Sequence, residues 1–176
     1  GADLNGCADT AFATVFVNPA PALQVSALPD TICVGESSTL TVSGALSYNW
    51  NGTGVTNQSG TTITVNPNQS EIYSVTGTNA IGCSATEQTE IIVISPPVIS
   101  FSGLSSTICE GDSLTVFASG ASAFEWSGSG ISNALANPQT ISPVQSATYQ
   151  IIGSIGGCKD TTSFTVGVFP LPTLEM

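Results

Sequence analysis

The chain repeats itself with a fixed period, and this period constrains its fold more than any other feature. The segment from Ile32 to Cys83 begins ICVGESSTLTVSGALSYNW and ends IYSVTGTNAIGC, and the segment from Ile108 to Cys158 begins ICEGDSLTVFASGASAFEW and ends TYQIIGSIGGC. Matching positions are 76 residues apart for Cys33 and Cys109, Trp50 and Trp126, and Tyr73 and Tyr149, and 75 apart for Cys83 and Cys158. Self-similarity at such a period indicates a tandem array of structural units.

The period predicts two complete repeats and parts of two others. The segment GADLNGCADTAFATVFVNPAP at the start aligns with GTNAIGCSATEQTEIIVISPP at 77–97, so that Cys7 takes the place of Cys83. LPTLEM at the other end aligns with the joint and opening strand of a further repeat, and we expect a longer polypeptide that continues at both ends. The expected divisions are the final strand of an incomplete preceding repeat at 1–21, complete repeats at 22–97 and 98–173, and the start of a following repeat at 174–176.

Composition narrows the possible partners. The formal net charge is −11 at pH 7, with one cationic side chain, Lys159, against 12 acidic ones. Nucleic acids and anionic lipid surfaces are bound through Lys and Arg, so neither is an expected partner. No apolar run approaches the roughly 18–20 residues of a membrane-spanning helix. We expect no membrane insertion in this segment, and we expect any targeting signal or anchor to lie outside it.

Period-two alternation of apolar and polar residues marks the strands of each repeat. No stretch shows helical periodicity with capping residues. The strands expected in the first repeat lie at 22–27 with a continuation at 31–33, around Leu40 and Val42, around Tyr48 and Trp50, at 54–57, at 61–66, around Tyr73 and Val75, and at 84–94. About seven short strands, close turns and a central tryptophan predict an all-β fold of tandem immunoglobulin-like β-sandwiches.

Residues 8–18 carry the same alternation, with Ala13, Val15 and Val17 on one face, and the pattern predicts a strand. A lone strand can neither cover that face nor pair its backbone groups. We therefore expect this strand to complete the preceding repeat. Insertion into the open sandwich of a neighbouring subunit is the alternative, but both complete repeats have a last strand of their own.

A proline-rich joint follows each copy of the last strand. Because proline restricts φ and the joints are short, we expect neighbouring repeats to be joined stiffly. The joint prolines are Pro19 and Pro21, Pro96 and Pro97, and Pro170 and Pro172.

Short motifs shared by both repeats resemble those of a known group of proteins. The elements I-C-x-G-[ED]-S, [ST]-G-A, Y/F-x-W, Y-x-[VI]-x-G and G-C are similar to the Ig-like or PKD-like repeats of large secreted surface proteins of Bacteroidetes. That group includes gliding-motility adhesins and other cargo of the type IX secretion system. The resemblance covers the whole chain and implies an extracellular, cell-surface location.

The predicted core differs from that of antibody domains, in which a disulfide joins two inward positions of facing strands. Those positions hold Val42 and Val75 in the first repeat, and Ala118 and Ile151 in the second. Apolar packing is therefore expected to close each core. The expected core residues are Trp50, Trp126, Tyr73 and Tyr149.

The cysteines, two in each repeat, suggest disulfides in a secreted array. Cys33 is expected at the C-terminal pole of its sandwich, where the chain leaves, and Cys83 at the opposite, N-terminal pole. A strand of about nine residues separates the poles by roughly 30 Å, whereas a disulfide spans only about 4.4–6.8 Å between Cα atoms. Stacked repeats bring Cys33 against Cys158, so an interdomain disulfide is favoured. Intradomain pairing, Cys33 with Cys83 and Cys109 with Cys158, and free thiols remain alternatives. The cysteines left for partners in further repeats are Cys7, Cys83 and Cys109.

We expect no catalytic, cofactor-binding or metal site. The chain has no histidine, and nucleophilic catalysis at its many Ser and Thr residues needs a nearby base. The cysteines fall about 25 or 50 residues apart with no CxxC pair, which argues against a zinc site. Glu110 and Asp112 flank a turn and are interpreted as solvated carboxylates rather than as a Ca²⁺ site. The sequence therefore predicts a protein that is not an enzyme.

Four of the five aspartates precede a Ser or Thr that is followed by a small or apolar residue. The tripeptide is similar to the O-glycosylation motif of secreted Bacteroidetes proteins, and the alternative is ordinary turn chemistry. Neutral glycans would protect strand edges that lysines protect in other β-proteins. The O-glycosylation candidates are Thr10, Thr31, Ser113 and Thr161.

Together these features predict a structural segment of an elongated adhesin stalk or filament at the cell surface, with neighbouring repeats of the same chain as its partners. The alternative is a carbohydrate-binding accessory module of a secreted glycan-degrading enzyme, which would take surface glycans as partners. Such a module needs a row of exposed aromatic side chains, whereas most aromatics here fall on inward positions.

Overall fold

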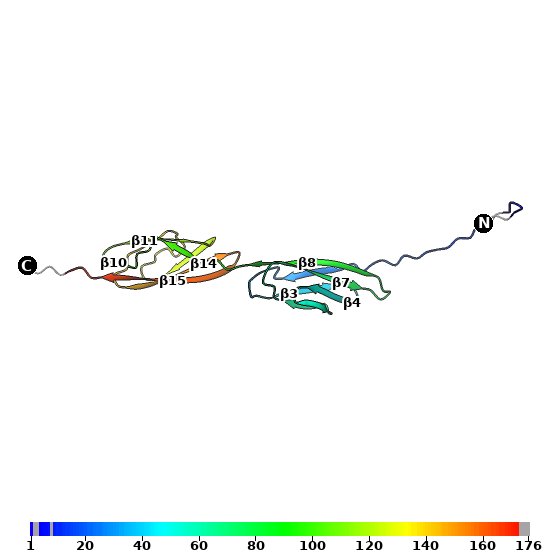
Figure 1. Ribbon diagram of the computed structural model, residues 1–176, viewed down its shortest axis with the longest axis horizontal. Helices are drawn as coiled ribbons and strands as arrows, with labels where there is room; N and C mark the ends of the chain where they lie inside the picture. Colours follow the sequence, from blue (N-terminus) through cyan, green and yellow to red (C-terminus); the bar gives the residue numbers. More distant parts are fainter. Residues whose placement is uncertain (2–3, 8, 173–176) are drawn as a thin grey trace, which may run out of the picture.

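The computed structural model describes residues 1, 4–7 and 9–172. Two β-sandwiches lie one after the other along the long axis, and the N-terminal segment extends away from the first (Figure 1). The described residues form strands and turns without a helix, so the predicted all-β fold is confirmed. Consistent with this, no helix in the described part of the chain is long and apolar enough to cross a membrane. The expected start of a following repeat at 174–176 lies outside the described residues.

The first sandwich has the strand order of an immunoglobulin-like domain. One sheet has the order β1-β3-β6 and the other the order β2-β8-β7-β4-β5. β2 runs parallel to β8, and the other paired strands are antiparallel. The strands are β1 (Gln24–Leu28), β2 (Thr31–Cys33), β3 (Ser38–Ser43), β4 (Ser47–Gly52), β5 (Val55–Gln58), β6 (Thr62–Val65), β7 (Glu71–Thr78) and β8 (Ser84–Ile94). Each strand expected from the alternation is present in this repeat.

The second sandwich repeats this topology. Its sheets have the orders β13-β11-β9 and β10-β15-β14-β12, with β10 parallel to β15. The strands are β9 (Ser100–Ser102), β10 (Thr107–Cys109), β11 (Leu114–Ser119), β12 (Ala123–Ser127), β13 (Gln139–Ile141), β14 (Ala147–Ile155) and β15 (Cys158–Phe169). Both repeats are therefore immunoglobulin-like.

The second repeat departs from the first beside β12. The strand β5 of the first repeat has no counterpart there, because the described residues between β12 and β13 form a loop. In the first repeat the carbonyl of Thr61 accepts the N–H of Val42 (2.9 Å). At the matching place the side chain of Asn137 bonds both backbone groups of Ala118, at 2.9 and 2.8 Å. A side-chain amide thus takes the place of the backbone acceptor at this position, and Pro138, which has no N–H to donate, follows it.

A fully buried tryptophan lies at the centre of each core. Trp50 is 0% exposed and Trp126 is 1% exposed. Tyr73 is also buried, and its ring covers Gly52, where a Cβ would lie 2.4 Å from the ring. The buried residues of the first core are Ile32, Leu40, Val42, Tyr48, Trp50, Val55, Ile63, Val65, Tyr73, Val75 and Ile91. Those of the second are Val116, Ala118, Trp126, Ile141, Tyr149, Ile151, Phe164 and Val166. Apolar residues thus occupy the inward positions that carry a disulfide in antibody domains.

Gln139 provides a test of polar burial. It is 4% exposed at the position that Ile63 occupies in the first repeat, and its Oε1 atom has no hydrogen-bond partner among the described residues. Burying an unpaired amide costs about 1–3 kcal/mol. We therefore expect Gln139→Ile to raise the free energy of unfolding of the second repeat by about this amount, and the matched Ile63→Gln to lower that of the first. Urea unfolding measures both, and a loss of stability in Gln139→Ile would show that the amide is paired.

Stability is also expected to fall in alkali, because two tyrosines are buried. The hydroxyl of Tyr149 donates to the carbonyl of Ser129 (3.0 Å), and that of Tyr73 to the carbonyl of Thr53 (3.4 Å). Burial raises the pKa of both phenols above the ordinary value of 10.0, and at Tyr73 the charge of Glu71 adds to it.

The folded protein therefore holds these protons more tightly than the unfolded chain. The contribution to stability is complete below about pH 10 and is lost as the pH rises through the raised pKa values. Tyrosinate absorbance and urea unfolding as functions of pH measure the effect. In Tyr149→Phe the alkaline loss in the second repeat should shrink, and an unchanged loss would contradict this origin.

The strand expected at 8–18 is not formed. Within the described part of this range the backbone pairs with no strand, and residues such as Val15 and Phe16 are 82% and 87% exposed. The alternation sets which side chains share a face, but a strand also needs a neighbour for its N–H and C=O groups. In the described chain this segment pairs with no strand, and it extends away from the first sandwich (Figure 1).

Candidate functional site: the joint between the repeats

The C-terminal pole of the first repeat presents Cys33 from a capped turn. Cys33 is the last residue of β2 and lies in register with Ile94 of β8. Its N–H donates to Glu36 Oε2 (2.9 Å), and the N–H of Glu36 donates to the carbonyl of Cys33 (2.9 Å). Between them Gly35 has a φ of +91°, which favours glycine. The residues of the I-C-x-G-[ED]-S motif thus form a turn that holds the cysteine in place.

The second repeat holds Cys109 in the same way. The N–H of Cys109 donates to Asp112 Oδ2 (3.3 Å), and the N–H of Asp112 donates to the carbonyl of Cys109 (3.1 Å). The interpretation of Asp112 as a merely solvated carboxylate was incomplete, because its side chain caps this turn. The signal in the sequence was an acidic residue three positions after the cysteine in both repeats.

The N-terminal pole of the second repeat is a two-residue turn between β14 and β15. Gly156 and Gly157 both have positive φ, +56° and +91°, as a tight hairpin turn requires. This turn packs against the end of the first repeat, since a Cβ on Gly156 would lie 2.4 Å from Cδ1 of Ile94. Cys158 follows and is 2% exposed. Sequence reasoning did not identify this contact between Ile94 and Gly156.

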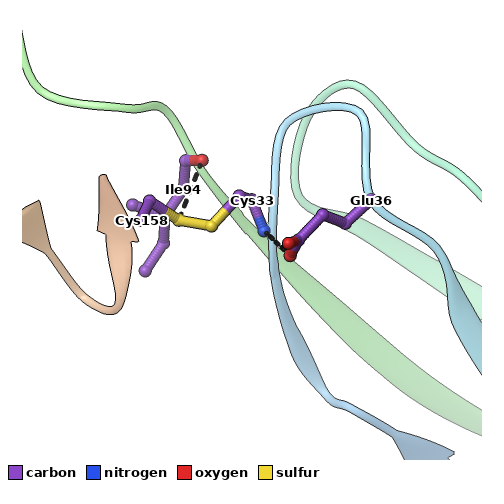
Figure 2. Close-up of a disulfide and its surroundings, with 4 residues drawn as sticks. All are labelled: Cys33, Glu36, Ile94 and Cys158. Carbon is purple, nitrogen blue, oxygen red and sulfur yellow. Dashed lines mark hydrogen bonds between the residues drawn. A yellow bond between two sulfur atoms is a disulfide. The ribbon is translucent and has the colours of Figure 1, made fainter. Parts of the chain in front are cut away.

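A disulfide joins the two poles. Cys33 and Cys158 are bonded with an S–S distance of 2.02 Å and a Cα–Cα distance of 5.6 Å. Figure 2 shows the bond running from the turn of Glu36 to the turn of the second repeat, with the carbonyl oxygen of Ile94 3.6 Å from Cys158 Sγ. The structure thus contains the interdomain pairing, and Cys83 and Cys109 are free thiols in it. Disulfides are typical of oxidising surroundings such as the cell exterior.

The N-terminal pole of the first repeat resembles that joint. The thiol of Cys83 lies 3.7 Å from the carbonyl oxygen of Asn18, the residue that matches Ile94 in the repeat register. Asn79 Nδ2 donates to the carbonyl of Pro19 (3.1 Å), and its Oδ1 accepts the N–H of Cys83 (2.9 Å). The segment before the first repeat therefore lies against this cysteine as the end of β8 lies against Cys158.

Three of the four O-glycosylation candidates lie at the surface, and the fourth is partly covered. Thr10, Ser113 and Thr161 are exposed, and Thr31 is half-buried. The preceding aspartate accepts the backbone N–H of Thr10 and of Thr161, each at 2.8 Å, whereas at Thr31 it accepts the hydroxyl, at 3.2 Å. The hydroxyls of Thr10 and Thr161 are thus exposed beside a carboxylate that is bonded to the backbone.

The remaining surface offers little that could hold a small ligand by stacking. Both tryptophans and all three tyrosines are buried. The exposed aromatics are phenylalanines: Phe12, Phe16, Phe117 and Phe169. Within the described residues, no three His, Cys, Asp or Glu side chains gather in a group that could hold a metal ion.

Comparisons with known proteins add likeness of fold alone. No protein-family model matches the chain, and no curated protein sequence matches it. Among solved structures, three N-terminal domains of the outer capsid protein Hoc of bacteriophage RB49 match with TM-score 0.49 and 13% identity, over 85% of this chain and 59% of that one. Murine CEACAM1b matches with TM-score 0.42 and 14% identity, over 84% and 100% of the two chains.

A 1.5-MDa bacterial ice-binding adhesin matches with TM-score 0.45 and 17% identity, over 86% of this chain and 66% of that one. The chain thus spans less than two thirds of the Hoc and adhesin structures that it resembles. At these identities and TM-scores the likenesses carry no argument about what this chain binds. What the chain itself presents is a tandem of immunoglobulin-like sandwiches with a covalently bridged joint.

Proposed function

We propose that this chain is a structural segment of an extracellular, elongated tandem-repeat adhesin, in which it serves as stalk or filament. The single observation that carries the proposal is the disulfide between Cys33 and Cys158, which bridges the joint next to the peptide link. A second bond across a short proline joint restricts bending and twisting between neighbouring sandwiches. Stiffness between repeats is the property that a stalk needs and that a soluble binding module does not.

The free thiols extend the proposal to further repeats. Cys109 is held by its turn as Cys33 is, and Cys83 lies against a backbone carbonyl as Cys158 does. One stands at the C-terminal pole of the second repeat and the other at the N-terminal pole of the first. Each pole thus carries half of a joint, and residues 8–18 carry the pattern of the last strand of a preceding repeat. In this proposal 22–97 and 98–173 are two units of a longer array, and 1–21 belongs to the unit before them.

Disulfide mapping of the native protein tests the array. Without reduction, we expect the peptide containing Cys83 to be linked to a peptide from outside residues 1–176, and the same for Cys109. The internal link between Cys33 and Cys158 serves as the positive control. Free, alkylatable thiols at both Cys83 and Cys109 in native material would contradict the array.

The finer assignment rests on the sequence resemblance to secreted surface proteins of Bacteroidetes, including gliding-motility adhesins and type IX secretion cargo. A surface with a single lysine and many neutral polar groups fits O-glycosylation at Thr10, Thr31, Ser113 and Thr161. Peptide mapping of protein from the source organism should find hexose-bearing forms of these peptides. Four unmodified hydroxyls would rule the glycoprotein assignment out. The burial of both tryptophans and all tyrosines speaks against the carbohydrate-binding alternative.

A further inference from the structure

The disulfide joins two points that are far apart along the chain. Cys33 and Cys158 are separated by 125 positions, whereas the peptide itself passes from β8 to β9 within a few residues. Two covalent links therefore cross the joint side by side. In Figure 2 the disulfide lies next to Ile94, where the peptide link leaves the first repeat.

We propose that this second link has a mechanical function: it carries tension past the two cores and limits how far the chain can be stretched. A load along the axis can pass through β1 and β2 to Cys33, across the disulfide, and along β15 from Cys158. Residues 34–157 lie off this route. Because load reaches the joint only in an elongated stalk, the inference rests on the proposed function.

The placement of the strands makes this route direct. β2 ends at the C-terminal pole, since Cys33 is in register with Ile94 at the end of β8. β15 begins at the joint with Cys158 and runs to Phe169 at the far pole, where it pairs with Cys109. The loaded segments are thus β1 and β2, each at an edge of its sheet, and β15, which lies between β10 and β14 and runs from pole to pole of the second sandwich. The strands that carry both tryptophans, β4 and β12, lie between them in the sequence and take no load.

The limit on extension follows from the length that the disulfide withholds. A stretched chain spans about 3.3–3.6 Å per residue. The 125-residue separation therefore withholds about 400–450 Å from any extension. Loss of the pairing of β1 and β2, or of β15, lengthens the chain only by those short segments. The covalent route through Cys33 and Cys158 therefore stays short even if one of the cores unfolds.

The same arrangement, a peptide link beside a disulfide, would repeat at every joint of an array. In the second repeat the segment from β9 to Cys109 and the strand β15 both run between the poles. If Cys109 pairs with the next repeat as Cys33 pairs with this one, tension divides between two covalent routes in each repeat. Residues 110–157 then lie off both routes.

Single-molecule stretching of the oxidised chain tests the proposal. Handles are attached at the two ends by enzymatic ligation, and Cys7, Cys83 and Cys109 are replaced by serine to leave one cysteine pair. The matched control carries Cys33→Ser in addition. The control should show two unfolding steps of about 200–250 Å each, which is the extended length of roughly 75 residues less the length of the folded sandwich. The oxidised chain should show neither step and should stop short by about 400–450 Å.

A thiol reductant provides the second arm. By thiol–disulfide exchange, dithiothreitol reduces the bond between Cys33 and Cys158 to two thiols and is itself oxidised to a cyclic disulfide. Its addition under load should release the withheld length in the oxidised chain and change nothing in the control. Equal extension of the oxidised chain and the control would overturn the proposal. This measurement does not depend on the disulfide map of the native protein. A failure of the proposed array can therefore be distinguished from a failure of the proposed mechanical role of the Cys33–Cys158 disulfide.

Discussion

Replacement of Trp50 by alanine should lower the free energy of unfolding of the first repeat by about 3–5 kcal/mol. The side chain is 0% exposed at the centre of its core, and its Nε1 donates to the carbonyl of Gly60 (3.0 Å). Alanine removes the buried ring and leaves a cavity that the surrounding strands can fill only in part. It also leaves the carbonyl of Gly60 without this donor.

Urea unfolding followed by circular dichroism measures the change. Leu46→Ala removes a large apolar side chain that is 75% exposed in the same repeat, and it should shift stability by no more than about 0.5 kcal/mol. Trp126→Ala should act on the second repeat and spare the first, because the two cores share no buried residue. A change below about 1 kcal/mol in Trp50→Ala would be incompatible with a core organised around this tryptophan.

Removal of the disulfide should have the second largest effect. Cys33→Ser is expected to lower stability by about 2–4 kcal/mol, because the cross-link closes a long loop and restricts the unfolded chain. This restriction is complete only when both repeats are unfolded. In the oxidised chain, the repeat that unfolds last should therefore be stabilised most by the bond. In the Cys33→Ser variant the two repeats should unfold in independent transitions.

Equilibrium unfolding of the oxidised chain, the reduced chain and the variant distinguishes these states. Reduction should reproduce Cys33→Ser, and the double variant with Cys158→Ser should cost little more than the single one, since one bond is lost in each. Cys109→Ser is the control, because this thiol is exposed and free in the structure. If the oxidised chain and the Cys33→Ser variant unfold at the same urea concentrations, the disulfide does not couple the two repeats.

Some of these properties could be read from the residues because their signals are local and repeated. Alternation at 38–43 and 71–78 identified the inward faces, and the doubled tryptophan and tyrosine marked the two cores. The direction of the strands then placed Cys33 and Cys83 at opposite poles. Burial against a partner sheet requires only apolar side chains at every second position of a strand. The alternation in the sequence was therefore enough to predict the inward faces and the core residues.

Other features depended on groups that are distant in the sequence. Residues 8–18 have the pattern of a strand, yet only an adjacent strand could have made them one. A loop takes the place of β5 beside β12, and the side chain of Asn137 takes the place of the backbone acceptor that Thr61 provides in the first repeat. The contact between Ile94 and Gly156 exists only where two sandwiches meet.

The sequence by itself determined the architecture of each repeat: its period, the faces of its strands and the apolar residues that fill its core. The placement of the cysteines at the poles favoured the pairing of Cys33 with Cys158, which intradomain pairing and free thiols left open until the structure showed the bond. The tertiary structure alone decided which strand edges are paired. The physical reason is that side-chain burial follows from short-range periodicity. Backbone pairing and disulfide bonding instead require two distant segments to meet at a defined distance, and this is settled only when both sandwiches are packed against the joint.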